Sequence, residues 1–401
     1  MLIEILALLL GLVAGTITGL FPGIHVNLVS VFLVSISPTL LNYTSPISLV
    51  VFITSMAVTH SFLDFIPSIF LGAPDEDSFL SILPGHELLK KGLGHEAFVL
   101  TLYGSFVALF IILIFIPIFI FILPSVHESI TYLIPYLLIF ISLYLIFQEE
   151  NFLNSLIIFS LAGLLGIITF NLPVKEPLLP LLTGLFGSSA LIVSLKNTSS
   201  ALAKQKISPL KKIKLPKKQL IKSVIAASIS APLCSFLPGI GSGHAATIGS
   251  EIFKQDKRQF LFLVGSINTV VIALSFIALY SINKTRSGAA VAIKEILKSL
   301  SFHDLTIIIM TIFISGILSF FVGIKISKIV AKNISKINYK LLSAITLLIL
   351  LLVNIIFSNL LGILVLITST SLGIFAIFSN SKRINLMASL LIPTIVFYLT
   401  I

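Results

Sequence analysis

Long apolar runs separated by short polar loops cover the chain from end to end. Fourteen of these runs are long enough to form membrane-embedded or buried helices. They lie at residues 2–20, 23–37, 46–71, 97–124, 130–147, 152–171, 177–195, 221–237, 238–254, 259–281, 303–324, 341–357, 360–378 and 384–400. The pattern predicts an all-α polytopic membrane protein with about 10–14 transmembrane or re-entrant helices.

A lysine-rich segment divides these runs into two sets of seven. Residues 196–222 carry nine lysines and no acidic residue. Because loops rich in Lys and Arg stay on the cytoplasmic side of a membrane, we place this linker inside the cell. The prediction is therefore an N-terminal transmembrane repeat at 1–195 and a C-terminal transmembrane repeat at 223–401, joined by a cytoplasmic linker.

The other basic residues test this placement. With the linker inside, the side of every other loop follows, and 21 of the 26 Lys and Arg residues lie inside. Both termini then lie outside. An odd number of crossings in each half gives the halves opposite orientations, as in transporters built from inverted repeats. The first run has no basic residue before it and no small-residue cleavage site, so we expect a retained helix and not a signal peptide.

Composition excludes several classes of protein. Hydrophobic residues make up 57% of the 401 positions and charged residues only 10%, whereas soluble domains carry about a quarter. The chain is therefore not an ordinary soluble protein, and its length leaves no room for a soluble catalytic domain. The net charge of +11 lies in loops between apolar runs, which suits the inner membrane surface and not a nucleic acid. The single cysteine, Cys234, allows neither an intramolecular disulfide nor a cysteine-rich metal site.

Two Pro-Gly motifs give the halves a weak internal repeat. Residues 19–24 read GLFPGI and residues 235–240 read SFLPGI, each at the end of the first run of its half. The runs that follow, 23–37 and 238–254, are too short for a ~30 Å hydrocarbon core at ~1.5 Å per residue. We expect them to begin within the membrane, where helix N-termini attract anions. The alternative is that the Pro-Gly pairs only mark loops between helices.

Polar residues beside these motifs are the first candidates for solute contacts. The predicted substrate-binding residues are Pro22, Gly23, His25, Asn27, Pro238, Gly239, Gly241, Ser242, Gly243, His244 and Arg286. Helix capping and small-residue packing would explain Ser242 and the glycines, but not two histidines within the membrane. Arg286 is one of only three arginines and suits a carboxylate or a phosphate. Alternatively, Arg286 is a charged loop residue that is exposed to solvent and does not bind the solute.

His60 and Asp64 form the candidate site for ion coupling. They stand four residues apart within the run 46–71, on one face of a helix. A carboxylate inside the membrane costs several kcal/mol unless it is paired, protonated or hydrated, so such residues are functional candidates by default. A His–Asp pair could carry a proton or help to hold Na⁺. The alternative is a neutral Asp that is hydrogen-bonded to a neighbouring helix.

No motif supports an enzyme. Residues 239–243 look like a serine-nucleophile turn, but isoleucine stands at position 240, where those motifs need glycine. No Walker A pattern and no His-Glu-x-x-His pattern occur in the sequence. We therefore expect no catalytic residues, no metal and no cofactor.

The motifs resemble the large membrane subunit (TctA) of the tripartite tricarboxylate transporters, and within that group its shorter archaeal-type relatives. The resemblance rests on Gly15-x-x-x-Gly19 followed by LFPGI, on FLPGIG at 236–241, and on the two-half layout. It implies secondary uptake of a small carboxylate, coupled to H⁺ or Na⁺, by a multi-pass protein of the plasma membrane. It also implies two partners, a small membrane subunit and an extracytoplasmic binding protein. The Pro-Gly residues would form the substrate site.

Two other functions stay open from the sequence. The Pro-Gly motif with Ile240 to Gly243 also resembles the translocases that return undecaprenyl phosphate across bacterial membranes. In that case the substrate would be a polyprenyl phosphate, a lipid carrier. The third function is a membrane scaffold or enzyme that transports nothing. The sequence also leaves open whether 2–37 and 221–254 span the membrane or form re-entrant hairpins.

Overall fold

The computed structural model describes residues 2–21, 26–71, 82–147, 149, 151–197, 203–237, 241–285, 287–334, 339–379 and 381–400. The first half contains α1 (Leu2–Leu20), α2 (Val26–Leu40), α3 (Pro46–Leu63), the π-helix η1 (Pro67–Leu71), α4 (Ile82–Lys90), α5 (Gly94–Ile130), η3 (Thr131–Leu133), α6 (Ile134–Phe147), α7 (Phe152–Asn171), α8 (Leu178–Leu182), the π-helix η4 (Thr183–Ser188) and α9 (Ser189–Asn197). The second half contains η5 (Leu210–Lys212), α10 (Lys217–Phe236), α11 (Ser242–Phe253), α12 (Lys257–Ile282), α13 (Gly288–Leu297), α14 (Phe302–Ile334), α15 (Tyr339–Phe378), η6 (Arg383–Met387) and α16 (Ala388–Thr400).

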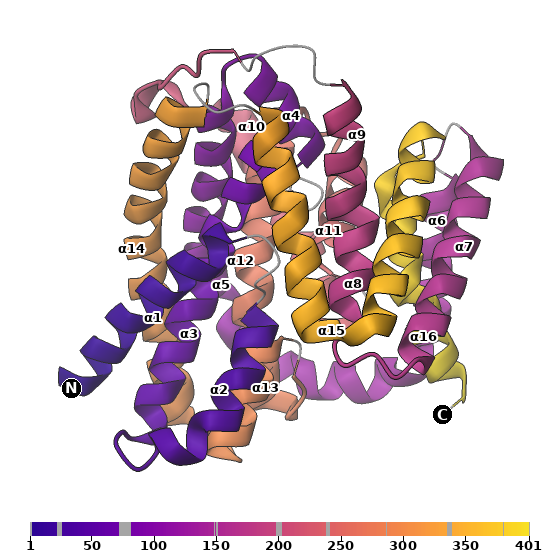
Figure 1. The fold of residues 1–401 in the computed structure, drawn as a ribbon. Coiled ribbons are helices and arrows are strands. Elements are labelled where there is room, and N and C mark those ends of the chain that lie inside the picture. Colours follow the sequence, from indigo (N-terminus) through magenta and orange to yellow (C-terminus); the bar gives the residue numbers. More distant parts are fainter. Residues whose placement is uncertain are drawn as a thin grey trace.

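Eight helices in the described part of the chain are long and apolar enough to cross a membrane. The described residues contain no strand. These two findings confirm the prediction of an all-α polytopic membrane protein (Figure 1).

Each of the fourteen predicted runs corresponds to helix in the structure. Helix α15 covers the last two runs before α16 and kinks at Asn359, whose φ of 61° interrupts the helical backbone. The side chain of Asn359 starts the helix again, because its Oδ1 accepts hydrogen bonds from the N–H groups of Leu361 and Gly362 at 3.1 and 3.3 Å. The sequence pattern missed α4 and α13, which have only nine and ten residues and are too short to stand out as membrane runs.

The first five elements of each half follow a similar order. The elements α1, α2, α3 with η1, α4 and α5 have counterparts in α10, α11, α12, α13 and α14. The third elements also have equal lengths: α3 together with η1 spans 26 residues, and so does α12. Figure 1 shows α4 near the top of the molecule and α13 near the bottom, as expected for halves of opposite orientation.

A sequence repeat accompanies the fourth and fifth elements of each half. Residues 87–96 read ELLKKGLGHE and residues 295–304 read EILKSLSFHD, so four of the ten positions are identical. In both halves the segment leaves a short helix and enters the first turn of a long one. This repeat is independent of the Pro-Gly motifs and supports the same pairing of the halves.

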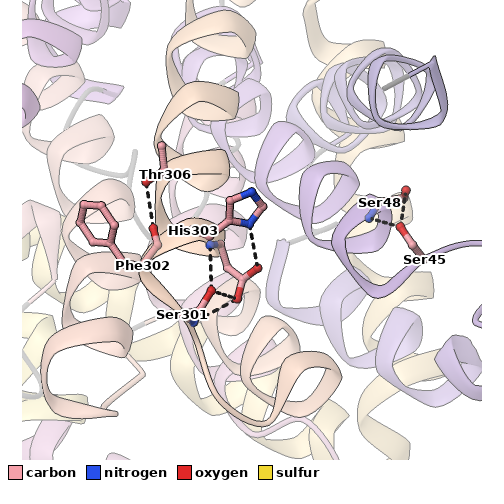
Figure 2. A network of polar contacts seen from close by, with 7 residues as sticks. Ser45, Ser48, Ser301, Phe302, His303 and Thr306 are labelled. Atoms are coloured by element: carbon pink, nitrogen blue, oxygen red, sulfur yellow. Dashed lines mark hydrogen bonds and ion pairs between the residues drawn. The ribbon is translucent and has the colours of Figure 1, made fainter.

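Helices α3 and α14 pack against each other and begin with capping serines (Figure 2). Ser45 Oγ accepts a hydrogen bond from the N–H of Ser48 at 3.2 Å. Ser301 and Asp304 cap α14 reciprocally: Ser301 Oγ accepts from the Asp304 N–H at 3.2 Å, and Asp304 Oδ2 accepts from the Ser301 N–H at 3.0 Å. These caps fix the points at which two neighbouring helices of different halves begin.

Helices of the two halves pack closely on each other. Helix α12 lies against α5, and α14 lies against α3. A methyl group on Gly104 of α5 would collide with the carbonyl group of Phe262, and one on Gly265 of α12 would collide with the backbone of Thr101. Small residues at such contacts let helices approach closely within a membrane. The halves therefore do not form separate domains, because their helices pack together in one bundle. Their relation as inverted repeats stays a prediction.

The predicted linker is ordered against the bundle over its described part, and we name residues 203–218 the lysine strap. Gln205 anchors it: Oε1 accepts from the N–H of Gly94 at 2.9 Å, and Nε2 donates to the carbonyl of Leu89 at 3.0 Å. The N–H of Lys206 also donates to the carbonyl of Gly92, in the loop between α4 and α5, at 2.7 Å. The strap lies along the top of Figure 1, near α4 and α10, and we name this end of the molecule the basic end.

Loops that the charge pattern assigns to one side of the membrane meet in the structure. At the basic end, Lys382 Nζ pairs with Glu251 Oε1 at 3.0 Å, which joins the loop before η6 to the last turn of α11, two segments predicted to lie at the inner side. At the other end, Asn359 Nδ2 donates to the carbonyl of Pro173 at 3.0 Å, which joins two loops predicted to lie outside. Figure 1 shows both termini in the lower half of the molecule, away from the strap. The side that each end faces stays a prediction from the charge rule.

Candidate functional site

The helix after the second Pro-Gly motif begins deep within the bundle. Helices α10 and α11 form a hairpin whose outer ends meet at the basic end, where Lys222 Nζ donates to the carbonyl of Lys254 at 2.9 Å. Helix α11 has 12 residues and so measures about 18 Å, well short of a ~30 Å hydrocarbon core. Its N-terminus therefore lies inside the bundle, as expected for a re-entrant helix.

His244 supplies a buried hydrogen-bond donor in the first turn of α11. Its side chain has 0% exposure, and its Nδ1 accepts a hydrogen bond from the N–H of Gly241 at 3.3 Å. A ring nitrogen that accepts from an N–H carries no proton, so in the neutral ring the proton lies on Nε2. Nε2 is buried, and no residue in the described part of the chain accepts a hydrogen bond from it.

Small residues precede His244 at the start of α11. Ser242 and Gly243 are buried, and Gly241 is half-buried. A methyl group added to Gly241 would meet no described atom within 4 Å, so the described residues leave room beside the start of the helix. Glycine lets a ligand approach backbone N–H groups closely, and the first N–H groups of a helix have no partner within the helix. Among the described residues, the start of α11 thus combines room beside Gly241, backbone donors and the buried imidazole donor of His244.

Several predicted site residues lie outside the described part of the chain. These are Pro22, Gly23, His25, Pro238, Gly239 and Arg286. The backbone of Asn27 belongs to α2, which begins at Val26 directly after the first motif, but its side chain is not described. Helix α2 packs against α13, and the two lie side by side at the lower end of Figure 1. The contacts of these residues stay predictions.

The predicted coupling residues lie in the interior, His60 in the last turn of α3 and Asp64 directly after its end. His60 is 6% exposed and Asp64 is 2% exposed. His60 Nδ1 lies 3.1 Å from the hydroxyl of Thr18 in α1, and Asp64 Oδ2 accepts a hydrogen bond from Asn268 Nδ2 of α12 at 3.2 Å. These two hydrogen bonds connect α3 to helices of both halves.

Helix α3 is interrupted beside Asp64. It ends at Leu63, and the π-helix η1 starts at Pro67. Proline has no N–H, so the carbonyl of Leu63 loses the donor that an α-helix would supply. Single π turns occur often at functional sites. Irregular backbone at membrane depth is tolerated where it is buried in protein or lines a cavity.

Asn268 is the neighbour that sequence analysis missed. It is the twelfth of 26 residues in α12, so the Asp64 cluster lies near the middle of a membrane-crossing helix. The second atom of its amide, Oδ1, is buried and has no partner in the described part of the chain. A carboxylate and an amide oxygen are the ligand types that hard cations prefer, and a buried water molecule would suit the same groups. An asparagine inside a strongly apolar run was the available signal.

The two described arginines bind groups of the protein itself. Arg258 Nη2 pairs with Glu96 Oε1 at 2.6 Å at the basic end. Arg383 Nη2 donates to the carbonyl of Leu185 at 3.1 Å, and its guanidinium lies 5.2 Å from the ring centre of Phe186. Arg383 thereby satisfies carbonyl groups of η4, a structural role that no local sequence pattern indicates. Among the three arginines, Arg286 alone is left as a candidate for binding the solute.

Comparison with known proteins identifies the family. Residues 5–388 match the model of the tripartite tricarboxylate transporter TctA family. The chain is 33% identical over 413 residues to the uncharacterized protein MJ1079 of Methanocaldococcus jannaschii, an alignment that covers 99% of this chain and 100% of that protein. No solved structure matches. Neither match favours the polyprenyl-phosphate translocase or an enzyme.

The family match also bears on partners and location. Proteins of this family work with a small membrane subunit and a binding protein. The match and the eight apolar helices together make the chain a multi-pass membrane subunit of a transporter. The chain belongs to the tripartite tricarboxylate transporter TctA family, as its Pro-Gly motifs predicted.

Proposed function

We propose that this chain translocates a small carboxylate across the plasma membrane by alternating access, coupled to H⁺ or Na⁺. The observation that carries the proposal is the buried start of α11, which combines the buried Nε2 donor of His244, backbone N–H groups and room beside Gly241 among the described residues. A helix start of this kind favours a negatively charged group through both its donors and its dipole. A carboxylate supplies two oxygens that can accept these hydrogen bonds.

The solute is bound between the two halves in this proposal. The helix starts after the two Pro-Gly motifs belong to equivalent elements, α2 and α11, of halves with opposite orientation. A carboxylate lying between them would be held from two directions. The proposed contacts are Pro22, Gly23, His25, Asn27, Pro238, Gly239, Gly241, Ser242, Gly243, His244 and Arg286.

Ion coupling is assigned to Asp64 and His60, with Asn268 as an additional ligand. The carboxylate of Asp64 is almost completely buried, so a bound proton or Na⁺ would remove the cost of a charge inside the membrane. Helix α12 connects the two sites, because it carries Asn268 and also packs against α11. Neutralising Asp64 would therefore act on the helix that supports the solute site.

The orientation of the proposal follows from charge. The basic end, with its strap of lysines, faces the cytoplasm, and both termini face outside. The starts of α3 and α14 then face the side from which a binding protein delivers solute. Alternating access moves the solute from that side to the basic end.

A thermal-shift panel tests the proposed function. The purified protein is heated with di- and tricarboxylates, phosphate or polyprenyl phosphate, with and without Na⁺ and at two pH values. A ligand that binds only the folded state raises the melting temperature. We expect a carboxylate to do so, and Na⁺ or acid to enlarge the shift. A shift from polyprenyl phosphate alone would overturn the carboxylate proposal.

A further inference from the structure

The lysine strap presents a dense row of positive charge to the outside of the molecule. Its lysines are all exposed, and the strap contains no acidic residue. They are Lys204, Lys206, Lys211, Lys212, Lys214, Lys217 and Lys218. Within the described residues, no ion pair or hydrogen bond involves the ammonium group of any of them. Seven such charges in sixteen residues repel one another unless a partner of opposite charge neutralises them.

The strap holds these lysines in place. Ile213 is completely buried, and Ile207 and Leu210 are half-buried against the bundle. The hydroxyl of Tyr103 in α5 donates to the carbonyl of Leu210 at 3.3 Å. Together with the hydrogen bonds of Gln205, these contacts fix the backbone, so apolar side chains point inward while the lysines between them point outward. The charged surface is therefore largely pre-formed, which reduces the ordering cost of binding.

The helix that follows places the strap at the membrane boundary. The exposed face of α10 begins with Lys218 and continues with Ile221, Ile225 and Ile229, which are 59%, 44% and 54% exposed. Their spacing of three, four and four residues puts them on one helix face. A face that changes from lysine to isoleucine within one turn is typical of a helix that passes from lipid headgroups into hydrocarbon. The strap lysines thus lie at the level of the headgroups.

We infer that the lysine strap is a binding surface for the phosphate groups of anionic membrane lipids. Clusters of four to eight basic residues directly beside a membrane helix attract such lipids. An acidic protein would satisfy the charges equally well, but it would not account for the isoleucine face that continues the strap into the membrane. Bound lipid would fasten the outer end of α10, the helix that leads to the proposed solute site. This inference is independent of the identity of the solute.

Tryptophan fluorescence offers a direct measurement, because the chain contains no tryptophan. Ile221→Trp places one reporter on the lipid-facing side of α10, just below the strap. Phe170→Trp is the matched reporter at the opposite end of the bundle, where Phe170 is 42% exposed on α7. Each variant of the full chain is reconstituted in mixtures of phosphatidylcholine and phosphatidylglycerol, one of which carries bromine on its chains and quenches the reporter. The quenching gives the relative affinity of the two lipids at each reporter.

Two sets of lysine substitutions complete the test. The strap variant carries K211Q, K212Q and K214Q, and the control carries K175Q, K284Q and K298Q, exposed lysines of the opposite end. Each lysine near a membrane surface strengthens binding to anionic lipid by roughly five-fold, so three removals weaken it on the order of a hundred-fold. Melting temperatures of all variants verify that they are folded.

The expected result is a preference for phosphatidylglycerol at residue 221 that disappears in the strap variant and at about 500 mM NaCl, where charges are screened. The control variant should keep the preference, and the reporter at residue 170 should show none. No preference at residue 221, or equal loss in the strap and control variants, would overturn the inference. In the first case an acidic protein becomes the better partner for the strap.

Discussion

His244 gives the sharpest test of the proposed solute site, because its two ring nitrogens have separate roles. Nδ1 accepts the hydrogen bond from Gly241, and Nε2 is the buried donor without a described partner. His244→Phe keeps the planar ring and removes both nitrogens. His244→Gln keeps one acceptor and one donor on a side chain of similar reach, as glutamine does in helix capping boxes.

The expected changes in free energy differ between the empty and the occupied site. In the empty protein, phenylalanine loses a hydrogen bond worth about 0.5–1.5 kcal/mol but also removes an unsatisfied donor that costs about 1–3 kcal/mol. The melting temperature should therefore stay level or rise. In the occupied site, a hydrogen bond to a carboxylate is worth about 1.5–3 kcal/mol. Its loss weakens solute binding by roughly ten- to 150-fold.

Isothermal titration of the purified variants with the carboxylate that gives the largest thermal shift measures both effects. His244→Phe should bind it at least ten-fold more weakly, and His244→Gln should recover part of the affinity. His95→Phe is the matched control, since His95 is equally buried, bonds through Nδ1 to Ser327 at 2.9 Å and also has an Nε2 without a described partner, but lies at the basic end, away from α11. An affinity of His244→Phe within two-fold of wild type would refute the assignment of the solute to this helix start.

The other predictions concern coupling, the anion clamp and pH. Asp64→Asn should abolish gradient-driven uptake into liposomes while solute binding persists, and retained accumulation would remove Asp64 from coupling. Arg286→Gln should weaken solute binding without lowering the melting temperature, and an unchanged affinity would exclude Arg286 from the site. Burial and the nearby charge of Lys90 lower the pKa of His86 to about 4, so folding stability should fall as pH drops from about 6.5 to 4, where the unfolded chain binds the extra proton. His86→Gln should reduce this acid sensitivity in thermal unfolding measured between pH 7 and pH 4, and an identical pH profile would contradict the argument.

The sequence predicted the helices well because membrane helices need long apolar runs. The sequence also predicted two separate runs, 341–357 and 360–378, for the two parts of α15. The polar positions around Asn359 interrupt the apolar pattern at the point where the backbone kinks. The sequence pattern did not predict helices α4 and α13, because they have only nine and ten residues and carry charged side chains that are typical of loops. The sequence pattern also predicted only a polar linker for the strap. Ile207, Leu210 and Ile213 alternate with lysines there, and these three apolar side chains pack against the bundle.

The candidate site was predictable only where chemistry stands out from an apolar background. Ser242 and His244 interrupt a hydrophobic run directly after a Pro-Gly pair, so composition alone drew attention to them. Asn268 also interrupts an apolar run, but an uncharged amide is a weaker signal than a histidine or a carboxylate, and Arg383 lies among loop cations. Their roles depend on partners that are distant in sequence, Asp64 at 204 positions and Leu185 at 198. Such pairings follow from the packing of helices and not from local pattern.

The repeat around α4 and α5 shows that the two ends of the bundle are not equivalent. In the first half, Glu96 pairs with Arg258 across the halves, and the neighbouring Glu87 pairs with Lys257 in the same way. In the second half, the matching acid Asp304 bonds to Ser301 within its own cap, and α3 begins with apolar residues where α12 begins with Lys257 and Arg258.

This asymmetry has a consequence for alternating access. Ion pairs join α12 to α4 and α5 at the basic end, so opening that end requires them to separate and become hydrated. Lys257 and Glu87 are 61% and 38% exposed, and an exposed pair of this kind contributes only about 0–1 kcal/mol. Arg258 is 41% exposed, while its partner Glu96 is only 13% exposed. The pairs can therefore favour a closed basic end in the empty bundle and still allow that end to open. In the proposed coupling, the energy that drives the solute in one direction comes from the gradient of the ion that binds Asp64, beside Asn268 near the middle of α12.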